Sequence, residues 1–289
     1  MLKRFTLALT SALTLSIASP TAWSAGDNQT FKLAFGSCAQ QEKDQPIWTA
    51  VNKEQADVFV FLGDNVYADT DKRDRMRAAW NMLGNKPGFK ALRQSDTKIM
   101  ATWDDHDYGA HDGGGDFHAK EMAREEFLRF FKEPEDSKRW TQETGINSAE
   151  VFRQGDKTIQ VILLDTRFNR SPITAVTDEE YKSVRKPAKR GKYKAVSEGT
   201  MLGEAQWKWL EAQLNQPADY RIIGSSIQLV AEFTGWESWA NKPHERQRFF
   251  DLLKKTKANG VVLISGDVHR AEVSQLNNEL SYPLWEVNQ

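Results

Sequence analysis

The amino-acid sequence predicts an α/β fold in which strands and helices alternate along the chain. Six short apolar runs have the length and composition of buried strands, at residues 31–35, 58–62, 99–103, 159–164, 220–223 and 261–264. Four segments between them are expected to be helices, at residues 74–83, 119–131, 203–214 and 243–257. This alternation indicates a sheet with helices packed against it.

Each apolar run leads directly into residues that can carry chemistry. In chain order the sequences that follow the runs are GSC (36–38), GDNVY (63–67), DDH (104–106), DTR (165–167), GSS (224–226) and SGDVH (265–269). Ligands of α/β sheets bind beyond the carboxyl ends of the strands. We therefore expect all six clusters to meet at one surface.

The helix expected over residues 203–214 illustrates how the intervening segments support such a sheet. It places Trp207, Leu210 and Leu214 on one face, which is the apolar stripe that packs on a core.

The first 25 residues have the pattern of a secretory signal peptide. Lys3 and Arg4 precede an apolar stretch over 5–18, and small residues follow it. A buried N-terminal helix is the alternative. We expect residues 26–289 to form one domain, exported to the periplasm or secreted, with no transmembrane anchor because no later segment is apolar for long enough.

The composition limits the partners of the protein. The chain has 39 basic and 40 acidic residues, a net charge of −1, which argues against a general nucleic-acid binder. Its single cysteine, Cys38, cannot form an internal disulfide, so it is buried, reactive or a metal ligand.

The side chains that follow the strands are typical of a centre with two metal ions. The residues able to bind metal are Cys38, Asp64, Tyr67, Asp105, His106, Asp267 and His269. Carboxylates with histidine and a thiolate suit a pair of cations bridged by a shared aspartate, as in displacement at phosphorus. A phenolate ligand such as Tyr67 favours Fe³⁺ over Zn²⁺.

The ordered motifs GSC, GDNVY, WDDHDYG, LDTR and SGDVH resemble the alkaline phosphatase D (PhoD-like) family of calcineurin-like metallophosphoesterases. The resemblance covers residues 31–286. It implies a sandwich of two mixed β-sheets flanked by helices. It also implies hydrolysis of phosphoesters, small or polymeric, at a centre that holds Fe³⁺ and Ca²⁺ or other divalent metals. Relatives continue with further strands after the stretch 281–289, so the domain is expected to be short at this end.

The resemblance also implies a role for each site residue. Cys38, Asp64, Tyr67, Asp105, Asp267 and His269 would bind the metals, with Asp64 as the bridge. A metal-activated hydroxide would attack phosphorus, and His106 would be the general acid that protonates the leaving oxygen. The alternatives are an inert buried thiol for Cys38, a turn cap for Asp64 and a structural histidine for His106.

Other residues near these motifs have two interpretations each. Arg167 is expected to bind a phosphate oxygen and assist catalysis, or else to pair with Asp165. His111 stands where relatives often carry Asn, and it would contact substrate or metal or lie at the surface. Asp104 and Asp107 would orient His106 or support a further calcium ion.

The aromatic residues Phe233, Trp236 and Trp239 would either rim a pocket and stack on a substrate or pack in the core. Taken together, the sequence predicts an exported, metal-dependent phosphoester hydrolase. A non-catalytic, metal-stabilised binding protein of the same fold is the alternative.

Overall fold

The computed structural model describes residues 30–183 and 191–289. The expected signal peptide over 1–25 lies outside these ranges. Within them, no helix is both long enough and apolar enough to cross a bilayer.

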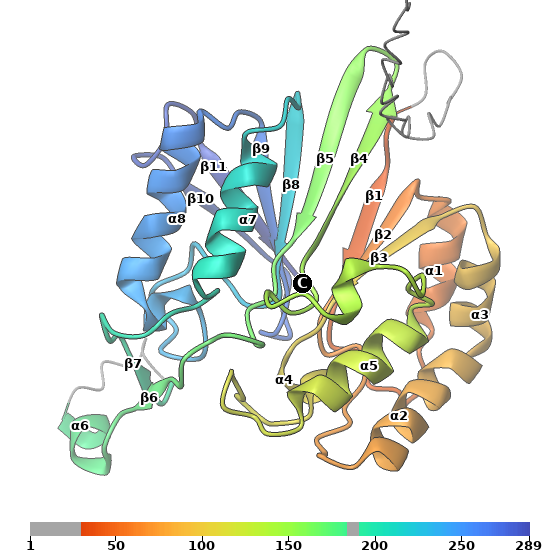
Figure 1. The fold of residues 1–289 in the computed structure, drawn as a ribbon, viewed down its shortest axis with the longest axis horizontal. Coiled ribbons are helices and arrows are strands. Elements are labelled where there is room, and N and C mark those ends of the chain that lie inside the picture. Colours follow the sequence, from red (N-terminus) through yellow and green to blue (C-terminus); the bar gives the residue numbers. More distant parts are fainter. Residues whose placement is uncertain (1–29, 184–190) are drawn as a thin grey trace, which may run out of the picture.

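The polypeptide forms two sheets that face each other, with helices on their outer sides (Figure 1). The strands of the described chain are β1 Leu33–Gly36, β2 Val58–Leu62, β3 Lys98–Thr102, β4 Ser148–Gln154, β5 Lys157–Leu163, β6 Thr174–Ala175, β7 Tyr193–Lys194, β8 Tyr220–Ser225, β9 Val261–Ser265, β10 Glu272–Leu276 and β11 Leu284–Asn288. The helices are α1 Ile47–Glu54, α2 Arg73–Asn85, α3 Pro87–Gln94, α4 Asp105–Tyr108, α5 Lys120–Phe130, α6 Asp178–Ser183, α7 Glu204–Leu214 and α8 Pro243–Thr256, with short 3-10 turns η1 Lys138–Trp140 and η2 Trp239–Asn241.

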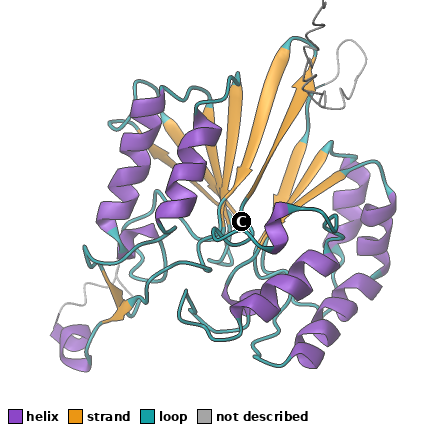
Figure 2. Cartoon of the chain, in the orientation of Figure 1, coloured by secondary structure: helices purple, strands orange, loops and turns teal. Residues whose placement is uncertain are grey.

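The smaller sheet has the order β1-β2-β3 with parallel pairs, and the larger has the order β10-β11-β9-β8-β5-β4. In the larger sheet β5, β8, β9 and β11 are parallel, whereas β4 and β10 run antiparallel at the two edges. Helices lie outside and strands inside, as Figure 2 shows. The expected two-sheet α/β architecture is thereby confirmed.

Three apolar clusters hold these layers together. Strand β2 is buried on both faces, and its Val58 and Val60 pack against Val161 and Ile264 of the larger sheet. A second cluster, rich in aromatic rings, joins the smaller sheet to α2, α3 and α5. A third joins the larger sheet to α7 and α8, and it contains the predicted stripe of α7, namely Trp207, Leu210 and Leu214.

The six predicted strands and four predicted helices are present, with ends that differ by a few residues. The sequence reasoning missed α1 and α3 and did not assign β4 and β10. The strands that matter for the site, β1, β2, β3, β5, β8 and β9, were all predicted. Because the parallel pairs share one direction, their carboxyl ends lie at a common edge.

Candidate metal centre and catalytic residues

The strand ends surround one cavity of about 410 Å³. Its walls include most of the expected site residues together with several that the sequence did not single out: Asp64, Asp105, His106, His111, Asp112, Lys192, Tyr193, Trp236, Glu237, Asp267, Val268, His269 and Arg270. The loops after β2, β3, β8 and β9 therefore meet at this cavity. The expected convergence of all six clusters is seen only in part, because Cys38, Tyr67 and Arg167 are not among the lining residues.

Sharp turns after the strands carry four of the expected ligands, of which Asp64, Asp267 and His269 line this cavity. Cys38, Asp64, Asp267 and His269 all have positive φ, at 57°, 50°, 74° and 53°. This left-handed region is costly for residues other than glycine, and such strain clusters at functional sites. These four residues lie in three turns, which follow the half-buried β1 and the largely buried β2 and β9.

Gly63 is needed for the close approach of the β2 and β3 ends. Its φ is 104°, and a Cβ atom there would lie 2.5 Å from the Cβ of Asp104. Any side chain would push Asp64 away from Asp104, so the glycine sets the distance between these two carboxylates.

Two groups of donor atoms can each hold a cation. Donor atoms of Cys38, Asp64 and His269 lie within 4.8 Å of one another, and the same holds for Asp64, Asp104 and Asp105. Asp64 belongs to both groups. The Tyr67 hydroxyl lies 3.1 Å from Nε2 of His269, next to the first group.

Two buried oxygen atoms at this junction support metal binding. Oδ1 of Asp64 and Oδ2 of Asp104 are buried and have no hydrogen-bond partner among the described residues. A buried carboxylate oxygen without a partner is costly, and a metal ion would satisfy both. The thiol, imidazole and carboxylate donors around them also suit transition metals and harder cations. The residues therefore fit a metal centre.

The crowding of acidic groups at this site also favours the binding of positive charge. Burial, and then the neighbouring Asp104, raises the pKa of Asp64 and of Asp267 well above the usual value. Burial, followed by the charge of Asp64, raises the pKa of the Cys38 thiol to about 12. Cations would reverse these effects and stabilise the anionic forms.

His106 is held by a carboxylate that the sequence reasoning missed. Its Nδ1 lies 2.7 Å from Oδ1 and 2.9 Å from Oδ2 of Asp69. Burial lowers the pKa of His106, but the hydrogen bond that its ring donates to Asp69 and the charge of Asp105 outweigh burial, so the pKa is raised. The sequence did contain a signal for Asp69 as a site residue, because Asp69 comes five residues after Asp64 in the same loop.

The expected roles of Asp104 and Asp107 as partners of His106 need correction, because both carboxylates bind elsewhere. Asp107 accepts hydrogen bonds from the backbone of Asn65 at 2.8 Å and of Asp104 at 2.6 Å. Asp104 caps the start of α4 and pairs with Arg167. Both therefore stabilise the loop that carries His106 without touching its ring.

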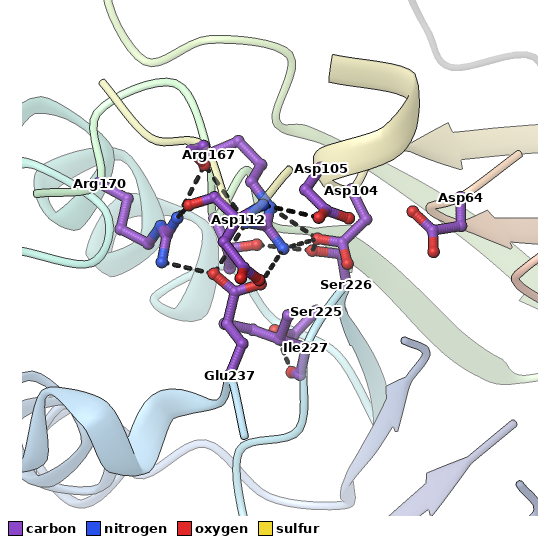
Figure 3. Close-up of polar contacts among 12 residues, drawn as sticks. Asp64, Asp104, Asp105, Asp112, Arg167, Arg170, Ser225, Ser226, Ile227 and Glu237 are labelled. Carbon is purple, nitrogen blue, oxygen red and sulfur yellow. Dashed lines mark hydrogen bonds and ion pairs between the residues drawn. The ribbon is translucent and has the colours of Figure 1, made fainter. Parts of the chain in front are cut away.

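Arg167 also lies differently from either expectation. Its guanidinium is fully buried between Asp104 and Glu237 (Figure 3). Its backbone N–H, not its side chain, bonds to Asp165. Arg170 continues the cluster by pairing with Glu237. Since every face of Arg167 is enclosed, it is placed to hold carboxylates, and binding of a phosphate oxygen would need it to leave them.

His111 lies at the cavity wall with its side chain 64 % exposed. Its Nδ1 is 3.1 Å from Oδ2 of Asp105, and its ring centroid is 5.6 Å from that of His106. Donor atoms of the three residues lie within 4.8 Å of one another. His111 is thus within reach of both a metal ligand and the expected general acid.

The three aromatic residues expected near a pocket differ in their surroundings. Trp236 lines the cavity and is 46 % exposed, Phe233 is 53 % exposed but lies outside its lining, and Trp239 is fully buried. The pocket interpretation therefore applies to Trp236 and the core interpretation to Trp239.

The two facing sheets with outer helices have the calcineurin-like phosphatase type of fold. Within that class, the chain belongs to the PhoD-like phosphatase family, which matches residues 33–287. Alkaline phosphatase D of Bacillus subtilis (strain 168) is 28% identical over 87 residues, which is 27% of this chain and 15% of that protein.

Solved structures agree on the fold. The structure of PhoD matches with a TM-score of 0.66 at 20% identity over 89% of this chain and 56% of that one. A dimetal phosphatase from Danio rerio matches with a TM-score of 0.53 at 14% identity, over 89% and 86% of the two chains. GAP50, described as the anchor in the inner membrane complex of Plasmodium, matches with a TM-score of 0.51 at 13% identity, over 89% and 70%. The chain thus spans about half of the PhoD chain and a smaller share of the curated relative.

Proposed function

We propose that the protein is an exported, metal-dependent hydrolase of phosphoesters, acting on monoesters or diesters. The observation that carries this proposal is that Asp64 and His269, which form a donor group with Cys38, line the same cavity as His106, whose ring is held by Asp69. Membership of the PhoD-like phosphatase family supports it. Export rests on the signal-peptide pattern of residues 1–25.

Two metal ions, Fe³⁺ and Ca²⁺, are the proposed cofactors. The ligands would be drawn from Cys38, Asp64, Tyr67, Asp105, Asp267 and His269, with Asp64 as the bridge because it belongs to both donor groups. The cysteine and tyrosine donors favour iron for one ion, and the carboxylates suit calcium for the other. When bound, such ions supply positive charge to the phosphoryl oxygens and a water nucleophile at neutral pH.

His106 is proposed as the general acid that protonates the leaving oxygen. Asp69 fixes Nδ1 through its hydrogen bond, so the ring keeps one orientation and Nε2 carries the proton to be donated. The raised pKa of His106 supports this role, because more of the ring is protonated near neutral pH. His111, exposed at the same wall, is proposed to contact the substrate.

Arg167 is proposed to act on catalysis through the residues it holds. Its contacts with Asp104 and Glu237 fix two loops of the cavity wall, those after β3 and after β8. Direct binding of a phosphate oxygen by Arg167 is the alternative, and the kinetics of Arg167 variants can test it.

The experiment is hydrolysis of aryl phosphate monoesters and diesters by purified protein reconstituted with Fe³⁺ and Ca²⁺. Turnover is expected, with loss of at least 100-fold in kcat for Asp64→Ala and His106→Ala. His118→Ala is the matched control, since His118 is an exposed histidine that pairs with Asp71 outside the cavity. Full metal occupancy without turnover would overturn the proposal and favour a metal-stabilised binding protein.

A further inference from the structure

We propose that Lys192, Tyr193 and Trp236 form a subsite for the leaving group of the substrate, and that this subsite takes an aromatic ring. The inference rests on the proposed phosphoesterase function and names the class of ester that this site prefers. All three residues line the cavity: Tyr193 belongs to β7, Lys192 directly precedes that strand, and Trp236 lies in the loop that follows β8.

The position of this wall relative to the general acid indicates which part of the substrate it meets. The ring of His111 lies next to that of His106, and its Nε2 is 3.4 Å from Oδ2 of Asp112. Asp112 in turn accepts a hydrogen bond from the Tyr193 hydroxyl and lies 3.6 Å from Nζ of Lys192. A general acid protonates the leaving oxygen, so the group attached to that oxygen extends toward Lys192 and Tyr193.

Asp112 also ties this wall to the expected metal ligands. Its backbone N–H donates to Oδ2 of Asp105 at 2.7 Å, while its carboxylate faces Tyr193. Movement of the wall away from the metal site would break one of these contacts. The subsite and the ligand Asp105 therefore keep a fixed separation.

Trp236 provides the surface on which an aromatic ring can stack. Its side chain is 46 % exposed and lines a cavity whose other walls are rich in carboxylates. A single exposed tryptophan elsewhere on a protein needs no explanation. Here the indole lies within a concave site, where its flat apolar face can bind another ring and exclude water.

A close backbone crossing fixes Trp236 against β7. The N–H of Gly191 donates to the carbonyl of Thr234 at 3.1 Å, and that of Tyr193 donates to Gly235 at 2.9 Å. A Cβ atom at Gly191 would lie 1.8 Å from the carbonyl carbon of Gly235, so only glycine fits there. The crossing holds the tryptophan beside Tyr193 before any substrate binds.

The base of the segment that carries β6, α6 and β7 is also anchored. This segment projects from the body of the molecule (Figure 1). Buried Lys242 donates to the carbonyl of Pro172 at 3.3 Å and to that of Glu198 at 3.1 Å, and thus binds both ends of the projection. Anchoring at both ends restricts the movement of this segment, as a cavity wall that must keep its position requires.

Lys192 adds positive charge at the mouth of an otherwise acidic cavity. Among the described lining residues the other fully basic side chain is Arg270, which is held by Glu272 at 2.7 Å. Lys192 is 47 % exposed and its nearest paired oxygen is 3.6 Å away, on Asp112. Lys192 is therefore placed to attract a negatively charged ester into the subsite.

The test compares the reconstituted enzyme on phenyl phosphate and on glycerol phosphate, which differ in the aromatic leaving group. Trp236→Ala is expected to lower kcat/KM for phenyl phosphate by about 5- to 100-fold, the range seen for loss of aromatic stacking, and to leave glycerol phosphate within about 2-fold. Trp236→Phe should restore most of the loss. Phe233→Ala is the matched control, because Phe233 is equally exposed but lies outside the cavity lining.

Lys192→Gln is a second arm, expected to raise KM for both esters by about 2- to 5-fold at low salt. Lys194→Gln is its control, since Lys194 lies two residues further along the chain but pairs with Glu180. An unchanged KM in Lys192→Gln would show that Lys192 is not part of the subsite.

Equal loss on both esters, or no loss on either, in Trp236→Ala would overturn the aromatic subsite while leaving phosphoester hydrolysis intact. If the wild-type protein hydrolyses neither ester, the subsite is judged by binding, and the proposed function fails if aryl phosphate diesters are not hydrolysed either. Calorimetry with phenylphosphonate and methylphosphonate should then show that Trp236→Ala weakens only the phenyl compound. Equal binding of both phosphonates by the wild type would refute the subsite.

Discussion

The imidazole of His106 and the carboxylate of Asp69 form a hydrogen-bonded pair at 2.7 Å, although they follow different strands of the smaller sheet. The backbone reinforces this pair, because the N–H groups of Ala68 and Asp69 both point to the carbonyl of His106 at 3.2 Å. The loop after β2 thus supplies both the expected bridging ligand, Asp64, and the residue that orients the proposed acid. The conformation of this one loop therefore sets the distance between the expected metal site and the proposed proton donor.

Asp69→Asn is expected to lower kcat by about 10- to 100-fold on esters with poor leaving groups and by less on activated ones. An amide cannot favour the protonated imidazole as a carboxylate does, so protonation of the leaving oxygen suffers most. The measurement is the slope of log kcat against the pKa of the leaving alcohol, which should become steeper. Asp71→Asn is the control, since Asp71 pairs with Lys72 and His118 instead. An unchanged slope would assign Asp69 a structural role only.

Arg167→Ala is expected to destabilise the protein by about 3–5 kcal/mol, because it leaves Asp104 and Glu237 buried without their partner. The free energy of unfolding in urea measures this loss. Arg153→Ala, at an exposed position of β4, should cost less than about 0.5 kcal/mol. Unchanged stability together with a KM raised at least 10-fold would instead restore Arg167 as a phosphate ligand.

The strands of the site were predictable because each is a short apolar run that ends in polar residues. The all-buried VFVFL of β2 is the plainest example. Strand β4 was not predicted because it lies at an edge of the larger sheet and all of its residues are half-buried or exposed, including the charged Glu150 and Arg153. Local composition there resembles that of a loop, and only pairing with β5 makes it a strand.

The predictable part of the site consists of residues next to strand ends, where position follows from the strand. The partners of Arg167 could not be predicted in this way. Asp104 and Glu237 are 63 and 70 residues distant in sequence. Asp104 follows β3 of the smaller sheet and meets Arg167 because the two sheets pack face to face, whereas Glu237 lies in the loop after β8, which is the neighbour of β5 in the larger sheet. The sequence therefore offered only a phosphate oxygen or the nearby Asp165 as partners of Arg167, whereas tertiary packing places Asp104 and Glu237 against its guanidinium.

Reconstitution with Fe³⁺ is expected to give a visible absorption band that depends on Tyr67 and Cys38. Phenolate and thiolate bound to ferric iron transfer charge to the metal, and both side chains lie beside the Asp64 and His269 donors. Tyr67→Phe and Cys38→Ser should each weaken or shift the band. Tyr193→Phe should leave it unchanged, because Tyr193 binds Asp112 at the other wall. A colourless, iron-replete protein would exclude both residues as ligands of the iron.

Glu245 of α8 should make the stability of the protein depend on acid pH. Its Oε2 accepts hydrogen bonds from Thr200 Oγ1 and Met201 N at 2.6 Å and from Trp207 Nε1 at 3.0 Å. Burial alone would raise the pKa of Glu245, but these bonds and then the charge of Arg248 outweigh burial and hold it below its usual 4.5. The ionised carboxylate thus stabilises the fold above about pH 4.5, and this contribution is lost as pH falls through the lowered pKa.

Glu245→Gln is therefore expected to reduce the free energy of unfolding at pH 7 and to flatten its decline below pH 4.5. Urea titrations at pH 7.0, 5.0, 4.0 and 3.5 measure both effects. Glu42→Gln, at an exposed position of the loop before α1, is the control and should follow the wild-type curve. A Glu245→Gln protein that loses stability in parallel with the wild type between pH 5 and 3.5 would contradict the assignment, because the acid-sensitive contribution would then come from other carboxylates.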